Sequence, residues 1–138
     1  MTGLRSSHSL AIANIVHLAQ QLGYEVELEH RILTTWPNGE KYRGRIDIAL
    51  HEKGSLKALI EVERPTFINP EVSKSAGTPN PSGYLRSKPS FDNSKIKLNA
   101  AGGSTIKIII STPNANDLSV NGLKEILDTT SDEIIIID

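Results

Sequence analysis

The sequence predicts an α/β domain whose helices and strands follow the order αβββαβαβ. Apolar residues first recur at helical spacing in SLAIANIVHLAQQL (residues 9–22), and the apolar period falls to two from Tyr24 onward. Two β-branched runs of the kind found in buried strands, TIKIIIST and DEIIIID, follow in the second half. With 138 residues, the chain fits a single domain (1–138) that buries one core without cross-links.

The first helix begins at an N-cap of Ser7 or Ser9 and ends at Gly23. The next ten residues, YEVELEHRIL (24–33), predict a strand with two unlike faces. Its apolar side is expected to hold Tyr24, Val26, Leu28 and Ile32, with the glutamates on the other side.

Two further strands complete a three-stranded meander. TTWPNGEK is a turn built on Pro, Asn and Gly, after which YRGRIDIALHE (42–52) resumes as a strand. The short connection KGS leads into LKALIEVER (56–64), and Pro65 ends this third strand because proline cannot donate to a sheet hydrogen bond.

The second half begins with a long connection over residues 66–90, which contains four prolines and has no sustained period. A connection of this length is a functional or a flexible loop. SFDNSKIKLNAAGG (90–103) then predicts a helix, and TIKIIIST (105–112) a buried strand. A helix over 117–130 and a buried last strand over 132–138 complete the order.

Composition excludes several kinds of site. The chain has no cysteine, which excludes disulfides, thiolate zinc sites and cysteine nucleophiles and fits a cytoplasmic protein. No apolar run approaches the ~20 residues of a membrane span, so no membrane partner is expected. Fifteen basic and sixteen acidic residues nearly cancel, but five cations face two anions over 71–97, while one lysine faces six acids over 117–138.

Three acids interrupt the apolar strands of the meander: Asp47 in the second strand, and Glu61 and Glu63 in the third. If the hairpin turns about Gly54, Asp47 lies opposite Glu61, and paired Cβ atoms are then ~5 Å apart. A two-residue turn at Lys53 and Gly54 would shift this register by one and place the acids on opposite faces unless a bulge restored it.

Converging carboxylates repel one another by up to roughly 4 kcal/mol per pair at an effective dielectric constant near 20. A hard cation such as Mg²⁺ compensates for this, since it binds a few carboxylates and keeps water or phosphate in its other positions. Bound there, it lowers the pKa of water and polarises a phosphoryl oxygen. The alternative is that the acids only line the solvated face of an antiparallel sheet.

The order of elements, with Asp in the second strand and Glu-x-Glu in the third, resembles the core of the PD-(D/E)XK nuclease superfamily from about Ser9 to Thr112. The resemblance implies a restriction-endonuclease-like αβββαβ core, with a mixed sheet flanked by helices, plus a C-terminal αβ unit. It also implies a DNA endonuclease in which Asp47 and Glu61 bind Mg²⁺, or Mn²⁺ in its place. The sequence departs from the family pattern where RID replaces Pro-Asp and where Glu63 stands in place of the motif lysine.

The resemblance leaves the group that activates water open: it is Glu63, as a further ligand or as a base, or a lysine from the following helix, Lys95 or Lys97. This first helix lacks the acid that family members often supply, and Glu29 is a candidate substitute as a metal ligand. Phosphates are expected on Arg43, Arg45 and Arg64 beside the acids, and on a basic rim of Lys74, Arg86 and Lys88. For the lysines and Glu29 the alternative is an exposed face, and for the arginines it is pairing with the acids.

Two other functions are open on the sequence. One is a nucleic-acid-binding or assembly module of the same fold that has lost catalysis along with the motif lysine. The other is an unrelated fold whose meander binds a protein partner. If the protein is a nuclease that cuts both strands of a duplex, a symmetric homodimer is favoured, because one site handles one strand.

Overall fold

The structure, a computed structural model, describes residues 7–35, 38–64, 87–100, 105–129 and 133–138. The helices within these ranges are α1 (Ser7–Gln21), α4 (Ser87–Ala100), α5 (Thr112–Asp117) and α6 (Val120–Leu127). The strands are β1 (Glu25–Thr35), β2 (Lys41–Glu52), β3 (Ser55–Glu63), β4 (Ile106–Ser111) and β5 (Ile135–Ile137).

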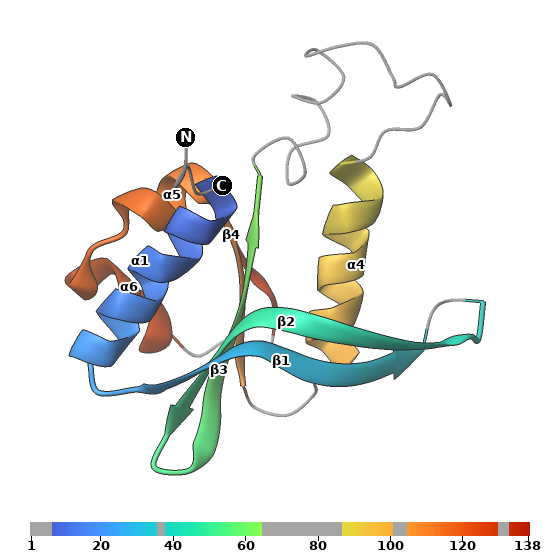
Figure 1. Cartoon of the computed structure of the whole chain (residues 1–138), viewed down its shortest axis with the longest axis horizontal. Helices are drawn as coiled ribbons and strands as arrows, with labels where there is room; N and C mark the ends of the chain where they lie inside the picture. The colour runs from blue at the N-terminus through green and yellow to red at the C-terminus, as the bar shows by residue number, and fades with distance from the viewer. Residues whose placement is uncertain (1–6, 36–37, 65–86, 101–104, 130–132) are drawn as a thin grey trace, which may run out of the picture.

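All five strands belong to one mixed sheet in the order β1-β2-β3-β4-β5. The β1-β2-β3 part is an antiparallel meander, whereas β4 and β5 join it in parallel. Helices α1, α5 and α6 lie on one side of the sheet, and α4 lies on the other (Figure 1). The predicted class, an α/β protein with a mixed sheet flanked by helices, is confirmed.

Alternate residues of the central strands supply two apolar clusters, one for each face of the sheet. Ile48 and Ile60 belong to the larger cluster, which includes Ile15 of α1 and Leu123 of α6. The smaller cluster lies under α4 and consists of Ile46, Ala49, Leu59, Leu98 and Ile109, all fully buried. The two clusters hold the helices in place on either side of β3 and β4.

The β2–β3 hairpin has the register that brings its acids together. Glu52 pairs with Ser55, so the turn contains only Lys53 and Gly54, both of which have positive φ. A bulge beside His51 shifts the register back by one residue, and from there the strands pair as a turn centred on Gly54 requires. This bulge restores the register in which Asp47 faces Glu61, as the prediction required for a two-residue turn.

The first two strands extend past the rest of the sheet as a two-stranded ribbon, which we call the arm (residues 30–35 and 41–46). Pairing between β2 and β3 ends at Ile48 and Ile60, whereas pairing between β1 and β2 continues to Thr35 and Lys41. In Figure 1 the arm runs beneath α4 and away from the other helices.

The arm twists sharply at its base, so the prediction of one apolar face along β1 is wrong. Glu29 has a positive φ of 53°. Val26, before it, packs on the α1 side of the sheet, while Ile32, after it, packs against the cluster under α4. Leu28, at the changeover, is 54% exposed. The faces are exchanged by this local backbone conformation, which an alternating pattern does not reveal.

Three boundaries in the second half also differ from the prediction. Helix α4 begins at Ser87, within the predicted loop, because Pro89 is compatible with the first turn of a helix. The single helix expected over 117–130 is replaced by α5 and α6, whose N-caps are Ser111 and Ser119. Strand β5 is three residues long and only half-buried, because it pairs with β4 alone among the described strands and lies at the edge of the sheet.

We expect Leu98→Ala to lower the free energy of unfolding by about 2–5 kcal/mol, because it leaves a cavity between α4 and the sheet. Leu33→Ala, on an arm residue that is 61% exposed, is the matched control and should cost less than about 1 kcal/mol. Urea denaturation followed by circular dichroism measures both variants. A Leu98→Ala protein as stable as the control would contradict the described packing of α4.

Candidate functional site

Asp47 and Glu61 lie together where β2 separates from β3, as the register about Gly54 predicts. The backbone N–H of Asp47 donates to Glu61 Oε1 (3.0 Å), and the backbone N–H of Val62 donates to Asp47 Oδ2 (2.9 Å). Ladder pairing between the two strands has ended one residue earlier. Each carboxylate thus satisfies a backbone donor of the opposite strand and holds the separated strands together.

Helix α4 adds Ser94 and Lys97 to this pair of acids. Lys97 Nζ donates to Glu61 Oε2 (3.2 Å) and to the backbone oxygen of Arg45 (2.8 Å). Ser94 Oγ lies 3.1 Å from Glu61 Oε2 and 2.6 Å from Glu63 Oε1. A hydroxyl group has one proton to donate, so both contacts are hydrogen bonds at once only when one of the two carboxyl groups carries a proton of its own.

The two predicted lysines of α4 are therefore placed differently. Lys97 lines the cavity of the acids, whereas Lys95 does not. Helical spacing places Lys97 on the same face as Ser94, three residues earlier, but it does not choose between the lysines, because Lys95 lies three residues before the buried Leu98. Ser94 itself was not predicted as a site residue.

His8 reaches the same site from the first turn of α1 and was also not predicted. Its Nε2 lies 3.0 Å from the backbone oxygen of Val62 and 3.3 Å from Asp47 Oδ2. Because both are acceptors, Nε2 carries a proton. The hydrogen bond to Asp47 raises the pKa of His8, although partial burial opposes the shift. These contacts span 39 and 54 residues of sequence, and no local motif marks His8 as their source.

These groups surround an open cavity of about 580 Å³. Its lining consists of His8, Asp47, Glu61, Val62, Glu63, Arg64 and Lys97. The side chain of Glu61 is 4% exposed, whereas that of Asp47 is 23% exposed. Glu61 thus forms the inner wall, and Asp47 lies closer to solvent.

The cavity disfavours full ionisation of its acids. Burial raises the pKa of Glu61 to about 7, with a further contribution from the charge of Asp47, while Lys97 acts in the opposite direction. Burial also raises the pKa of Glu63, and the Ser94 hydrogen bond opposes this shift. The cavity holds three carboxyl groups together with Lys97, Arg64 and His8, and the burial of Glu61 and Glu63 favours a proton, or another cation, beside them.

The donor chemistry of Asp47 and Glu61 fits Mg²⁺, which takes oxygen ligands and commonly binds proteins through one or two carboxylates. In the part of the chain that the structure describes, no group of three or more His, Cys, Asp or Glu side chains has an arrangement that holds a metal ion. The carboxylate oxygens accept from backbone N–H groups, Ser94 and Lys97 instead. The described side chains therefore fit a metal site of two carboxylates, Asp47 and Glu61. Glu63 is not arranged with them as a third ligand.

The other predicted residues lie outside this cavity or at its edge. Arg64 lines the cavity. Glu29 is 71% exposed and pairs with Arg45 (3.2 Å), and it lines a neighbouring hollow with Asp47 instead of the cavity itself. Arg43 lines a separate hollow on the arm. Lys74 and Arg86 lie outside the described residues, and Lys88 lies in α4 with its side chain outside them.

Comparison with protein-family models, with curated proteins and with solved structures finds no match for this chain. Among the described residues, no helix has both the length and the apolar character that crossing a membrane requires.

We expect the stability of the metal-free protein to fall as pH rises from about 4.5 to about 7. Folded Glu61 has the raised pKa, so it keeps its proton in a range where the unfolded chain has lost it, and this stabilisation disappears as the pH passes the folded pKa. Glu61→Gln, a neutral mimic, should match the wild type near pH 5 and be more stable by roughly 1–3 kcal/mol near pH 8.

Chemical denaturation in the presence of EDTA, at pH 5 and pH 8, measures this difference. Glu125→Gln, an exposed residue of α6, controls for the loss of one carboxylate. If Glu61→Gln shows no gain over wild type at the higher pH, burial of Glu61 does not have the assigned effect on its pKa.

Proposed function

We propose that this protein is a Mg²⁺-dependent endonuclease that hydrolyses phosphodiester bonds of DNA. The observation that supports this proposal most is the convergence of Asp47, Glu61 and Lys97 in one open cavity, from β2, β3 and α4. The mixed sheet with helices on both faces is consistent in general kind with the restriction-endonuclease-like fold, which we propose for the chain. Mn²⁺ is expected to substitute for Mg²⁺.

Asp47 and Glu61 would hold the metal ion. Bound there, the ion would supply a bound water of lowered pKa and a positive charge for the phosphoryl oxygens. Asp47 is the accessible member of the pair, and His8 orients it by its contact with Oδ2. Glu61 is held from both sides, by the Asp47 N–H and by Lys97, so its orientation is defined before any ligand binds.

Glu63 and Lys97 have complementary roles in this proposal. Glu63 lines the cavity, and its raised pKa brings it closer to the operating pH, where a carboxylate is a more effective proton acceptor. We assign it the proton of the attacking water. Lys97 lines the same cavity and is fixed by two hydrogen bonds. Its charge stabilises the additional negative charge on the phosphoryl group in the transition state.

A second candidate is a DNA-binding or assembly module of the same fold without catalysis. One observation favours it: Lys97 already pairs with Glu61, so the most buried acid has a cation partner within the chain. This module would bind DNA without requiring metal. Melting curves with and without millimolar Mg²⁺ separate the two candidates, because an ion that binds only the folded state raises the melting temperature.

We expect Asp47→Asn to lower the rate of DNA cleavage by roughly 10³-fold or more, because it removes a charged metal ligand. The assay uses supercoiled and linear duplex with Mg²⁺ or Mn²⁺. Asp117→Asn, on the exposed surface of α5, is the matched control and should cleave at the wild-type rate. A folded wild-type protein that leaves duplex, single-stranded and branched DNA intact with either ion would refute the nuclease proposal.

A second pair of variants tests the assignment on α4. Lys97→Met should lower kcat by about 10²–10³-fold, as expected for loss of one preorganised donor to the transition state. Lys95→Met removes an equal charge two residues away, outside the cavity, and should have a much smaller effect. Equal losses in both variants would indicate that the lysines act through general attraction of DNA and not at the reacting phosphate.

A further inference from the structure

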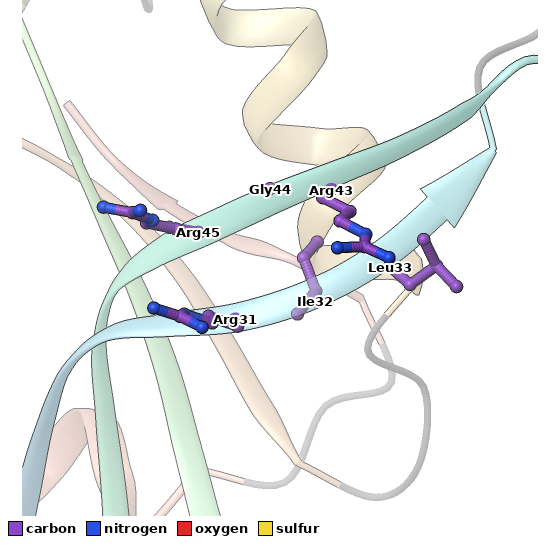
Figure 2. Close-up of a pocket in the computed structure, with 6 residues that line it drawn as sticks. All are labelled: Arg31, Ile32, Leu33, Arg43, Gly44 and Arg45. Carbon is purple, nitrogen blue, oxygen red and sulfur yellow. The ribbon is translucent and has the colours of Figure 1, made fainter.

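The arm carries three arginines on one face. Arg31 and Arg45 are direct partners across the β1–β2 ladder, and Arg43 follows the same face of β2. On the opposite face, Ile32 and Ile46 pack into the cluster under α4. The arginines therefore point away from α4, and in Figure 2 the side chains of Arg31 and Arg45 reach the same way from neighbouring strands.

These residues line a hollow of about 520 Å³ on the arm. Its lining consists of Arg31, Ile32, Leu33, Arg43, Gly44 and Arg45 and includes no acidic residue (Figure 2). Leu33, one of the lining residues, is 61% exposed, so the hollow is open to solvent and partly apolar. Strong positive charge in an accessible depression favours an anionic ligand.

Interactions within the described structure do not account for all three charges. Arg45 pairs with Glu29 at 3.2 Å, and both side chains are mostly exposed. No ion pair with another described residue involves Arg31 or Arg43. Like charges placed directly opposite each other on a ladder are destabilising, and Arg31 and Arg45 have this arrangement. A bound polyanion would remove that cost.

The arginine face begins beside the acid cavity. Arg45 lies two residues before Asp47 on β2, and Lys97 donates both to the backbone oxygen of Arg45 and to Glu61. Between the two sites, Glu29 lines a smaller hollow of about 350 Å³ together with His8 and Asp47. A strand of nucleic acid that lies along the arm would pass Glu29, whose charge Arg45 partly neutralises, before it reaches Asp47.

We propose that Arg31, Arg43 and Arg45 bind the phosphate backbone of a DNA duplex and guide one strand into the acid cavity, an inference that rests on the proposed nuclease function. Guanidinium groups bind phosphates bidentately. Arg43 and Arg45 lie about 7 Å apart along β2. Phosphates recur every ~3.4 Å of helix axis in each strand, so the two arginines contact different phosphates. These contacts position the duplex and do not read its sequence.

The test measures binding of a fluorescein-labelled duplex by anisotropy, over salt concentrations from about 50 to 200 mM. All proteins carry Asp47→Asn to prevent cleavage. The variant Arg31→Gln/Arg43→Gln removes two of the arm charges. It should weaken binding about tenfold or more and lower the slope of log K against log salt by about two. The matched control, Lys53→Gln/Lys124→Gln, removes two exposed charges away from the arm and should bind as the parent does.

A charge-conserving variant and a measurement of thermal stability complete the experiment. Arg31→Lys/Arg43→Lys keeps the charges and should retain the salt slope. Thermal melting should show Arg31→Gln/Arg43→Gln to be folded and no less stable than the parent, since it relieves repulsion. A folded Arg31→Gln/Arg43→Gln variant whose affinity and salt slope match those of the parent would overturn the arm proposal. An equal loss of affinity in the control Lys53→Gln/Lys124→Gln would overturn it too.

Cleavage by the protein without Asp47→Asn separates this inference from the proposed function. If the protein cuts DNA and the arm variants bind normally, only the arm proposal fails. If it binds DNA through the arm and cuts nothing under any metal condition, the nuclease proposal fails and the arm remains the DNA-binding surface of the alternative module. If it neither binds nor cuts DNA, both proposals fail.

Discussion

The structure depends on a reciprocal exchange between β2 and β3 at the point where the two strands separate. The Asp47 N–H is held by the Glu61 carboxylate, and the Asp47 carboxylate holds the Val62 N–H. A ladder that ended here without these contacts would leave two partly buried backbone donors unsatisfied, at a cost of up to about 1–3 kcal/mol for each. The same two carboxylates close the sheet and form the wall of the cavity, so stability and proposed function meet in one pair of side chains.

Separation of the strands also explains how helices on opposite faces reach one site. His8 comes from α1 and Lys97 comes from α4, which pack on different sides of the sheet. Within an intact sheet these two side chains would be kept apart by the ladder. At the end of the β2–β3 pairing both approach Asp47 and Glu61, which gives the cavity a cationic or titratable group from each side.

The acid cavity holds carboxyl groups that lie close enough to repel one another when charged. Glu61 is almost fully buried beside Asp47, and among the described residues Lys97 is the one permanent cation that pairs with it. Without a metal ion, the pKa of Glu61 is raised and its carboxyl group retains a proton. A divalent ion would replace that proton and leave both Asp47 and Glu61 charged. The arm nearby has an excess of positive charge, because its three arginines have one carboxylate partner, Glu29, within the described structure. Acids at the centre and cations along the approach are the arrangement expected for a metal-assisted reaction on a polyanion.

Most of the fold was predictable from local patterns in the sequence. Hydrophobic periodicity, turn residues and β-branched runs located α1, the meander and β4 within a few residues, because these signals arise from the pleat and the helical repeat themselves. The sequence also placed Asp47 opposite Glu61, on condition of a bulge. Spacing along α4 left both Lys95 and Lys97 open, and the folded chain placed Lys97 at the cavity.

Tertiary structure decided what local patterns do not encode. The bulge beside His51 sets the register, and the positive φ of Glu29 turns the arm so that Ile32 packs under α4 and the arginines face outward. His8 joins the site over a separation of 39 residues from Asp47. Hydrophobic periodicity reveals none of these features, because the first two are local irregularities of the backbone and the third is a contact between segments far apart in the sequence. The sequence determined which chemical groups are present, and the folded chain determined which of them meet.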